Sequence, residues 1–325
     1  MGFDYVTVGH VTADVLEDAS ATAGPSVTTE ASDGRRQPGG GAFYSALQAA
    51  RLGLRTLILT RGVPRALEAL MAPYAAELEI EIAPAQQTTT LSTRGRGHDR
   101  AQRLLGWAGP FAEPVTVDTA ILHLAPIARE TPRSWRGRAD FVGLTPQGLV
   151  RAWDAGGAVT TGPLDRARLP RECDAIVFSA SERASCAELL PGAGAGTELP
   201  PGAGAGTELP PDAGLAAPAA APGWDAASAR TDLAGAVVAV TAGARPTTVL
   251  RAGDAPIGVP PPTIASPRDD LGAGDVFAAA FFVALHEGRS PGEAAAFGNA
   301  AAAVRIAGVG PQAIGDRRAI EARLS

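Results

Sequence analysis

Short runs of apolar residues alternate along the chain with longer stretches of helical period. This alternation is typical of βαβ units, in which a mainly parallel sheet has helices on both faces. Several runs are apolar throughout, as expected of strands that are covered on both sides. The predicted strands span residues 5–8, 54–59, 78–82, 119–124, 140–144, 175–178 and 236–241.

The predicted helices follow most of these strands. They span residues 42–52, 65–77, 182–190, 274–287, 291–307 and 316–324. Ser290 stands at the N-cap of the fifth helix and Pro291 in its first turn, two residue types that are favoured at helix starts. The pattern therefore predicts an α/β protein.

Two polar stretches interrupt the alternation, at residues 15–37 and 86–106. Both are rich in Thr and Arg and lack a helical period. We expect them to form short antiparallel strands outside the main sheet, which together make a small lid.

A third interruption spans residues 191–223. The sequence PGAGAGTELP occurs at 191–200 and again at 201–210, and a Pro- and Ala-rich run follows. Its glycines do not form a dinucleotide-binding loop, because Pro200 and Pro201 stand where a helix would have to begin. We expect a disordered Pro/Gly/Ala-rich insertion that is dispensable for chemistry.

Length and charge narrow the possible functions. The chain has 325 residues, 46% of them hydrophobic, which suits one large domain over 1–325. The net charge is −6, and no basic run occurs. Because nucleic acids are bound by clustered cations, we expect no nucleic-acid partner.

All 28 basic residues are arginine, so the chain contains no lysine. A P-loop NTPase needs a lysine on its phosphates, and a protein kinase needs one on a strand. Enzymes that form a Schiff base need a lysine nucleophile. All three classes are excluded together.

The two cysteines, Cys173 and Cys186, and the four histidines do not cluster, so we expect no structural zinc site. No apolar run is long enough to span a membrane, and the N-terminus lacks the pattern of a leader peptide. We expect a soluble, cytoplasmic protein with no membrane partner.

The strongest functional signal is the segment 269–278, DDLGAGDVFA. Gly272, Ala273 and Gly274 are small and stand at a helix start, where free amides and the helix dipole favour an anion. Asp275 adds a carboxylate there, which is unfavourable unless it has a task. Deprotonating a hydroxyl that attacks a bound phosphoryl group is such a task. A tight turn with Asp275 as a helix cap would explain the motif structurally.

This segment resembles the signature of the ribokinase-like, or phosphofructokinase-B-type, carbohydrate kinases. The resemblance covers nearly the whole chain apart from 191–223. It implies a ribokinase-like three-layer sandwich with a small β lid, and an ATP-dependent kinase acting on a hydroxyl of a sugar or cyclic polyol. Further segments resemble the family in the same order, at 8–14, 38–42, 49–53, 174–182, 240–243 and 298–302.

On the side of the transferred phosphate, the resemblance implies that Asp275 is the general base. It also implies that Gly272, Ala273 and Gly274 form the anion hole.

On the acceptor side, the resemblance implies that Asp14, Gly39 and Gly40 hold the acceptor's hydroxyls. His10 stands where many family members carry a polar residue that binds the acceptor. It fits equally well as a histidine with satisfied hydrogen bonds at a strand end.

On the nucleotide side, the resemblance implies roles for Ser179, Glu182, Thr241, Gly243 and Asn299. Glu182 would organise Mg²⁺ through water. Ser179 replaces the family's Asn, and its shorter side chain puts the metal and phosphate contacts in question. The implied cofactors are ATP and Mg²⁺, with a monovalent cation as a further candidate.

Two weaker signals leave alternatives open. Gln147 and Arg151 follow a predicted strand, so they either face a ligand at its carboxyl end or form an ordinary turn. The Gln-Gly-x-x-Arg pattern resembles the inositol-kinase-like branch, which favours a cyclic polyol such as myo-inositol. In the lid, Arg100 and Arg103 suit phosphate, but we favour a solvated β-ribbon.

Competing functions remain open at this point. A nucleoside kinase would have the same fold with a different pocket. A non-catalytic nucleotide- or sugar-binding relative is motivated by Ser179, although the intact motif at 272–275 argues against it. A dinucleotide oxidoreductase is the weakest alternative, since no strand runs into a G-x-G-x-x-G helix. A homodimer through the lid is one assembly that the resemblance allows.

Overall fold

A nine-stranded sheet forms the body of the protein in the computed structural model, which describes residues 2–17, 36–95, 100–191 and 233–324. Each of the seven predicted strands is present. The structure adds two strands that were not predicted, β14 and β15. The strands are β1 (Phe3–Val8), β4 (Thr56–Gly62), β5 (Glu79–Pro84), β8 (Val115–Leu124), β9 (Trp135–Leu144), β12 (Ala175–Ser179), β13 (Val237–Ala242), β14 (Arg245–Leu250) and β15 (Ile257–Val259).

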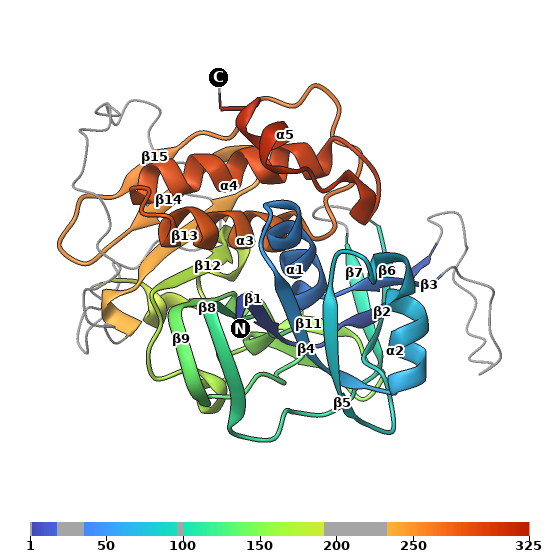
Figure 1. The fold of residues 1–325 in the computed structure, drawn as a ribbon. Coiled ribbons are helices and arrows are strands. Elements are labelled where there is room, and N and C mark those ends of the chain that lie inside the picture. The colour runs from blue at the N-terminus through green and yellow to red at the C-terminus, as the bar shows by residue number, and fades with distance from the viewer. Residues whose placement is uncertain (1, 18–35, 96–99, 192–232, 325) are drawn as a thin grey trace.

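The strand order is β15-β14-β13-β12-β9-β8-β1-β4-β5 (Figure 1). From β13 to β5 all neighbouring strands are parallel, while β14 and β15 are added antiparallel at one edge. The predicted fold class, a mainly parallel sheet with packed helices, is confirmed. Parallel strands bring their carboxyl ends to one edge, which is where ligands of such sheets bind.

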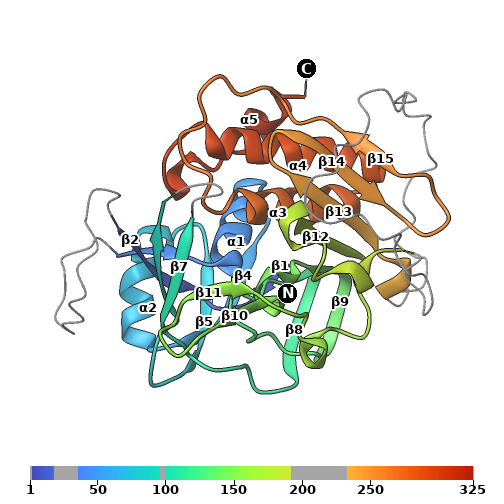
Figure 2. The same cartoon turned by 180° about the vertical axis from the view of Figure 1, so that it is seen from behind.

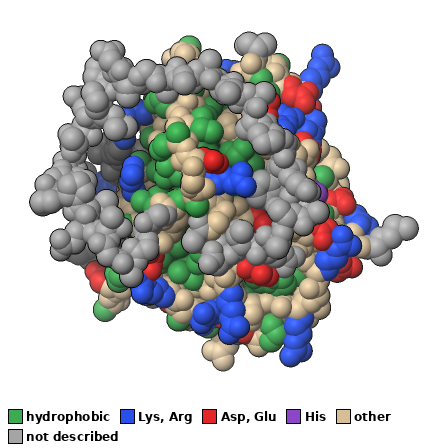
Figure 3. All heavy atoms as spheres, turned by 90° about the vertical axis from the view of Figure 1, so that its left-hand side faces the viewer, with side chains coloured by type: hydrophobic (Ala, Val, Ile, Leu, Met, Phe, Trp, Pro, Cys, Tyr) green, Lys and Arg blue, Asp and Glu red, His purple; other side chains and the backbone are tan. Residues whose placement is uncertain are grey.

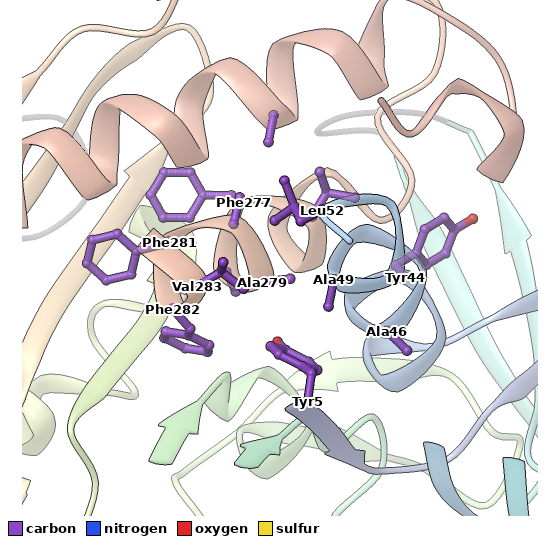
Figure 4. Packing of buried hydrophobic residues seen from close by; sticks show 14 of the residues in the cluster. Tyr5, Tyr44, Ala46, Ala49, Leu52, Phe277, Ala279, Phe281, Phe282 and Val283 are labelled. Atoms are coloured by element: carbon purple, nitrogen blue, oxygen red, sulfur yellow. The ribbon is translucent and has the colours of Figure 1, made fainter. Parts of the chain in front are cut away.

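The α-helices pack on one face of this sheet (Figure 1). Helices α1 and α3 lie side by side over β1, and their buried residues form one apolar core with Tyr5 (Figure 4). The rows of Ala and Phe in α3 make it almost wholly buried, as a central helix requires. The helices are α1 (Gly41–Arg51), α2 (Pro64–Met71), α3 (Ala273–His286), α4 (Pro291–Ile306) and α5 (Arg317–Glu321).

Two predicted helices differ from the structure. The helix predicted at 65–77 ends at Met71 and continues as the 3-10 turn Ala72–Tyr74. The helix predicted at 182–190 is wrong, since this segment contains only the 3-10 turns Ala180–Glu182 and Ala187–Leu189. Ser179 and Glu182 form a capping box, which favours a helix start, but the segment continues as 3-10 turns with Cys186 and Leu189 buried in a second core.

The second face of the sheet is covered differently from the prediction. Among the described residues, its apolar core is closed by loops and 3-10 turns, without an α-helix. The connection from β8 to β9, at 125–134, is too short for a crossover helix. The connection from β9 to β12 folds instead into a hairpin of β10 (Arg151–Trp153) and β11 (Val159–Thr161). Apart from this face, the layers are those expected.

A second sheet stands beside the first, with the order β3-β2-β6-β7, and is called the small sheet below. It contains β2 (Thr12–Glu17), β3 (Arg36–Gly39), β6 (Thr90–Arg94) and β7 (Ala101–Gly106). These strands fall largely in the stretches 15–37 and 86–106 expected outside the main sheet. β2 and β6 pair parallel rather than antiparallel. Residues 18–35 and nearly all of the insertion predicted at 191–223 lie outside the described residues.

The β10–β11 hairpin joins the small sheet to the body. It lies next to β7 in the view from behind (Figure 2), and Arg103 and Ala158 form a β-bridge between them. The amide of Leu104 in β7 also donates to the carbonyl of Gly157, at 2.8 Å. The small sheet is therefore attached to the body along its β7 edge.

The side of the molecule at the left of Figure 1 is shown face-on in Figure 3. Hydrophobic side chains occupy its visible centre, and acidic and basic side chains are interspersed around them. None of the helices in the described ranges has the length and hydropathy that a bilayer-crossing segment requires.

Candidate active site

A cavity of about 130 Å³ lies where the carboxyl ends of the central strands meet α3 and the small sheet. Residues of β2, β12 and β13 line it, together with Thr145 just after β9 and the segment that enters α3, so parts far apart in sequence converge here. Of the residues predicted for the site, it brings together Asp14, Gly40, Ser179, Glu182, Thr241, Gly272, Gly274 and Asp275.

The N-terminus of α3 presents free amides to this cavity. Gly272 is its N-cap, in the left-handed conformation with φ +78°. A Cβ here would lie 2.4 Å from the ring of Tyr44, so glycine is required on both counts. In the described part of the chain, the amides of Gly274 and Asp275 have no backbone acceptor. Together with the positive end of the helix dipole, they suit an anion.

A buried arginine holds this segment in place. Arg305 of α4 is fully buried and donates to the carboxylate and carbonyl of Asp269 and to the carbonyl of Leu271. Asp269 also accepts the amides of Leu271 and Gly310. Burial alone would raise the pKa of Asp269, but these hydrogen bonds lower it overall, so the carboxylate stays ionised. The segment that enters α3 is thus rigid before any ligand binds.

Asp275 lies in the first turn of α3, with its carboxylate toward the cavity. Its pKa is raised to about 7, mainly because protein surrounds it, and further because Glu182 and Asp14 are negative; Arg151 opposes the shift. A Cβ on Gly41 would lie 3.0 Å from Asp275 Oδ1, so the start of α1 closes tightly on the carboxylate. A carboxylate poised near neutral pH can take up a proton during a reaction.

Asp14 enters the cavity from β2 and is only 2% exposed. Burial raises its pKa to about 6, although the Thr12 hydroxyl, which donates to Oδ1 at 2.7 Å, and nearby arginines oppose the shift. Gly39 and Gly40 make room around it. A Cβ on Gly39 would lie 2.1 Å from Asp14 Oδ2, and Gly40 has φ +88°.

Arg151 is a cavity residue that the sequence left undecided. Its guanidinium donates to the carbonyl of Ile127 and to Gln102 Oε1, both at 3.1 Å. Burial lowers its pKa, while the carboxylates of Glu182, Asp275 and Asp14, among others, raise it. The structure therefore places this cation among Glu182, Asp275 and Asp14, three of the carboxylates that line the cavity. Gln147 lines the cavity as well.

The small sheet also contributes residues that the sequence analysis did not assign to the site. Arg100, just before β7, forms an ion pair with Asp270, and both line the cavity. The solvated ribbon favoured for this arginine is wrong, because its side chain is only 24% exposed. The signal available in sequence was the Arg-x-Gln spacing of Arg100 and Gln102, which sends both side chains to one face of a strand.

On the β12 side, one oxygen of Glu182 accepts the amide of Ser179 at 2.9 Å, which leaves the other oxygen for the cavity. The Ser179 hydroxyl is bound to Ser181. Within the described ranges, no three or more His, Cys, Asp or Glu residues cluster to hold a metal directly. A single carboxylate oxygen suits Mg²⁺, which keeps several waters and takes the rest of its ligands from phosphates. The residues present thus fit Mg²⁺ held through water.

Other predicted site residues do not line the cavity. The imidazole of His10 is buried against Thr89, with Nδ1 at 2.7 Å from its hydroxyl. Asn299 accepts from Thr247 and donates to the carbonyl of Val259, which ties α4 to the sheet edge. Gly243, with φ +65°, lies in the β13–β14 turn. Their predicted ligand contacts remain predictions.

Comparison with known proteins supports the expected family. Residues 219–316 match the sequence profile of the pfkB family carbohydrate kinases. A search of curated proteins found no match. The C-terminal part, which contains the motif at 269–278, therefore carries the family signature in sequence.

Solved structures extend the likeness to the whole chain. Ribokinase from Arabidopsis thaliana, complexed with ribose and ATP, is 19% identical with a TM-score of 0.66, covering 100% of this chain and 99% of that one. A pyrophosphate-dependent kinase in the ribokinase family, complexed with a pyrophosphate analog and myo-inositol, is 18% identical with a TM-score of 0.64, covering 98% and 99%. Ribokinase from Thermotoga maritima is 18% identical, also with a TM-score of 0.64, covering 99% of each chain. The fold is that of the ribokinase family, and the resemblance found in the sequence is confirmed.

Proposed function

We propose that this chain, a kinase of the ribokinase-like fold, transfers the γ-phosphate of ATP to a hydroxyl of a sugar or cyclic polyol. One observation carries the proposal. Asp275, with a pKa near neutrality, shares a cavity with the free amides at the start of α3 and with the buried carboxylate of Asp14. This combination supports a base that acts between a bound phosphate and the hydroxyls of an acceptor.

Each residue of the site has a separate role in the proposed reaction. Asp275 accepts the proton of the attacking hydroxyl as its oxygen bonds to the γ-phosphorus. The bond from that phosphorus to the β-phosphate oxygen breaks, and ADP leaves. The amides of Gly274 and Asp275 and the helix dipole stabilise the negative charge on the phosphoryl oxygens. Arg151 opposes the pKa rise at Asp275, so that it is partly ionised at neutral pH.

The charges of the cavity favour a neutral acceptor with several hydroxyls. Asp14 can accept two hydroxyl hydrogen bonds, and Gln147 can donate or accept. The two arginines are already engaged, Arg100 by Asp270 and Arg151 by Ile127, Gln102 and the carboxylates around it. No cation of the described lining is left for an acidic acceptor. This supports a sugar or cyclic polyol, with myo-inositol as a candidate.

For the donor, we propose that Ser179 and Thr241 bind phosphate oxygens and that Glu182 holds Mg²⁺ through water. The metal supplies neutralisation of charge on the phosphates. The small sheet acts as a lid, closed by Arg100 on Asp270.

Pyrophosphate is a second candidate donor. Of the residues expected on the nucleotide side, Ser179, Glu182 and Thr241 line the cavity, whereas Gly243 and Asn299 do not, and the Asn299 amide is already bonded at both ends. A donor without a nucleoside would need only the first group.

The test is a panel of acceptors with each donor. ATP and pyrophosphate are supplied with Mg²⁺ to sugars, inositols and nucleosides, and phosphorylated product is measured for the wild type and for Asp275→Asn. We expect turnover with a sugar or inositol that Asp275→Asn abolishes. Preference for a nucleoside would overturn the acceptor, and binding of ATP and polyol without any turnover would identify a non-catalytic relative.

A further inference from the structure

A chain of three hydrogen-bonded side chains runs beneath the cavity. The hydroxyl of Tyr5 on β1 lies 2.9 Å from Nδ1 of His123 on β8, and Nε2 of His123 lies 3.1 Å from the hydroxyl of Thr145. Thr145 follows β9 directly and lines the cavity. The three strands are neighbours, so the chain crosses the sheet from the core to the site.

Tyr5 and His123 are completely buried. Figure 4 shows Tyr5 beneath α1 and α3, with its hydroxyl toward the side of Phe282. The Phe282 ring meets His123 edge-on, with centroids 4.9 Å apart. In these surroundings burial lowers the pKa of His123 to about 3, so the imidazole is neutral and carries one ring proton.

One ring proton allows two arrangements. If Nδ1 carried it, His123 would donate to Tyr5, whose own proton would need another acceptor; within the described residues Tyr5 has no second hydrogen-bond partner. A buried donor without an acceptor is strongly unfavourable. In the other arrangement Tyr5 donates to Nδ1, and the Nε2 proton is donated to Thr145. Every buried proton is then satisfied.

The second arrangement fixes the direction of the Thr145 hydroxyl. Its oxygen already accepts from His123, so its proton is free to be donated elsewhere, and the cavity is the open side. Serine, threonine and tyrosine hydroxyls usually rotate to suit either role. Here the buried pair removes that freedom, and the cavity gains a donor of fixed polarity.

We propose that Thr145 is a specificity-determining residue that donates a hydrogen bond to one oxygen of the acceptor substrate, with Tyr5 and His123 as the residues that orient it. The assignment rests on the proposed kinase function. An acceptor needs a hydroxyl, ether or carbonyl oxygen at this place. A deoxy analogue offers no partner, and a protonated amine, which only donates, is rejected.

Kinetics of Thr145 variants test the contact, with the best acceptor of the panel. Thr145→Val keeps the shape and loses the hydroxyl, and Thr145→Ser is the matched control. We expect Thr145→Val to raise the acceptor KM about three- to tenfold, the scale of one neutral hydrogen bond, with kcat changed less than about twofold. Thr145→Ser should stay close to the wild type.

Deoxy analogues of that acceptor locate the partner oxygen. One monodeoxy analogue should bind the wild type as weakly as the parent acceptor binds Thr145→Val, and should be insensitive to the substitution. Equal loss for all analogues, or an unchanged KM in Thr145→Val, would overturn the assignment.

The ring nitrogen of His123 that carries the proton can be identified without measuring enzyme turnover. Nitrogen-15 NMR of the wild type, with His123→Gln used to assign the signal, should show neutral His123 protonated at Nε2. Protonation at Nδ1 would refute the proposal even in an active enzyme. If instead no acceptor is phosphorylated but Nε2 carries the proton, the kinase function has failed while the oriented hydroxyl stands. Thermal melting of each variant shows that it is folded.

Discussion

The guanidinium of Arg100 contacts the carboxylate of Asp270, and this ion pair joins the small sheet to the segment that enters α3. The two residues are distant in sequence and meet above the cavity. Both side chains remain partly exposed, at 24% and 43%, so their pairing contributes little to folding, within about 1 kcal/mol. Its effect should instead appear in substrate binding.

We therefore expect Arg100→Ala to raise the KM of the acceptor about three- to tenfold, because the lid loses its closing contact, with a change in unfolding free energy below about 1 kcal/mol. Steady-state kinetics and thermal melting measure the two. Arg103→Ala is the matched control, since it removes an exposed arginine whose guanidinium donates to the Gly156 carbonyl. The double variant Arg100→Ala/Asp270→Ala should have an acceptor KM close to that of Arg100→Ala alone. If the effects of the two single substitutions on KM were fully additive, the two residues would not act through their ion pair.

Asp275→Asn should lower kcat at least ~10²-fold, the scale of general-base catalysis, with little change in donor affinity. It should also stabilise the fold at pH 8. The folded-state pKa of about 7 lies above the ordinary aspartate value of 3.8, so the carboxylate's contribution to stability is fully present below about pH 4 and is lost as the pH rises through about 7. From these two pKa values, removing the charge should gain about 4 kcal/mol at pH 8 and less than about 2 kcal/mol at pH 5. A variant that is less stable at pH 8 would contradict this placement of charge.

The pH profile follows from the same group. The base must be ionised to accept a proton, so kcat/KM for the acceptor should fall about tenfold per pH unit below about 7 and level off above it. Protonation of Asp14, with a pKa of about 6, should steepen the acidic limb. The profile is measured with saturating donor between pH 5 and 8.5. A rate that is flat across pH 7 would remove Asp275 as the base.

Asp14→Ala should raise the acceptor KM, with kcat/KM reduced about ten- to a hundredfold, the cost of losing a charged hydrogen-bond partner. The donor KM should hardly change, because the proposed donor contacts, Ser179 and Thr241, belong to β12 and β13 of the main sheet, whereas Asp14 belongs to β2 of the small sheet. Thr12→Val is the control, since it removes only the hydroxyl that holds Asp14. Loss of thermal stability with unchanged acceptor kinetics would make Asp14 a structural residue.

Two glycines of the motif separate folding from ligand binding. Gly272→Ala should destabilise the protein by about 1–3 kcal/mol, because its Cβ would meet the Tyr44 ring in a left-handed conformation. Gly274→Ala meets nothing within 4 Å and should fold normally, while its methyl group faces the anion site. Thermal melting and kcat/KM of both variants test this. Normal activity in Gly274→Ala would argue against an anion at this point.

The parts of the fold that follow one local pattern could be predicted from the sequence. Examples are the apolar runs of β1, β8 and β13 and the helix that begins at Ala273. They are recognisable in the sequence because buried elements consist of continuous apolar residues. The three-residue strands β10 and β11 could not be predicted, since they exist through contact with β7 rather than through propensity. The same holds for the missing helix at 182–190, where the capping box of Ser179 and Glu182 favours a helix start but the chain continues as 3-10 turns that bury Cys186 and Leu189.

The site divides in the same way. Asp275 could be named as a candidate from the chemistry of its own motif, and Asp14 from the resemblance of the segment 8–14 to the family. Arg100, Arg151 and Thr145 act through partners that only the fold brings near, namely Asp270, Gln102 and His123. A pattern along one segment carries no information about such partners.

The hairpin of β10 and β11 restrains the small sheet, so that the proposed lid does not move independently of the hairpin. Its bridge to β7 and the bond between Leu104 and Gly157 tie the outer strand to the same hairpin whose first residue is Arg151. Swinging β7 outward would therefore either break these backbone contacts or pull on the arginine beside Asp14 and Asp275. The β10–β11 hairpin therefore couples opening of the cavity to the position of Arg151, and so to the pKa values of the carboxylates around it.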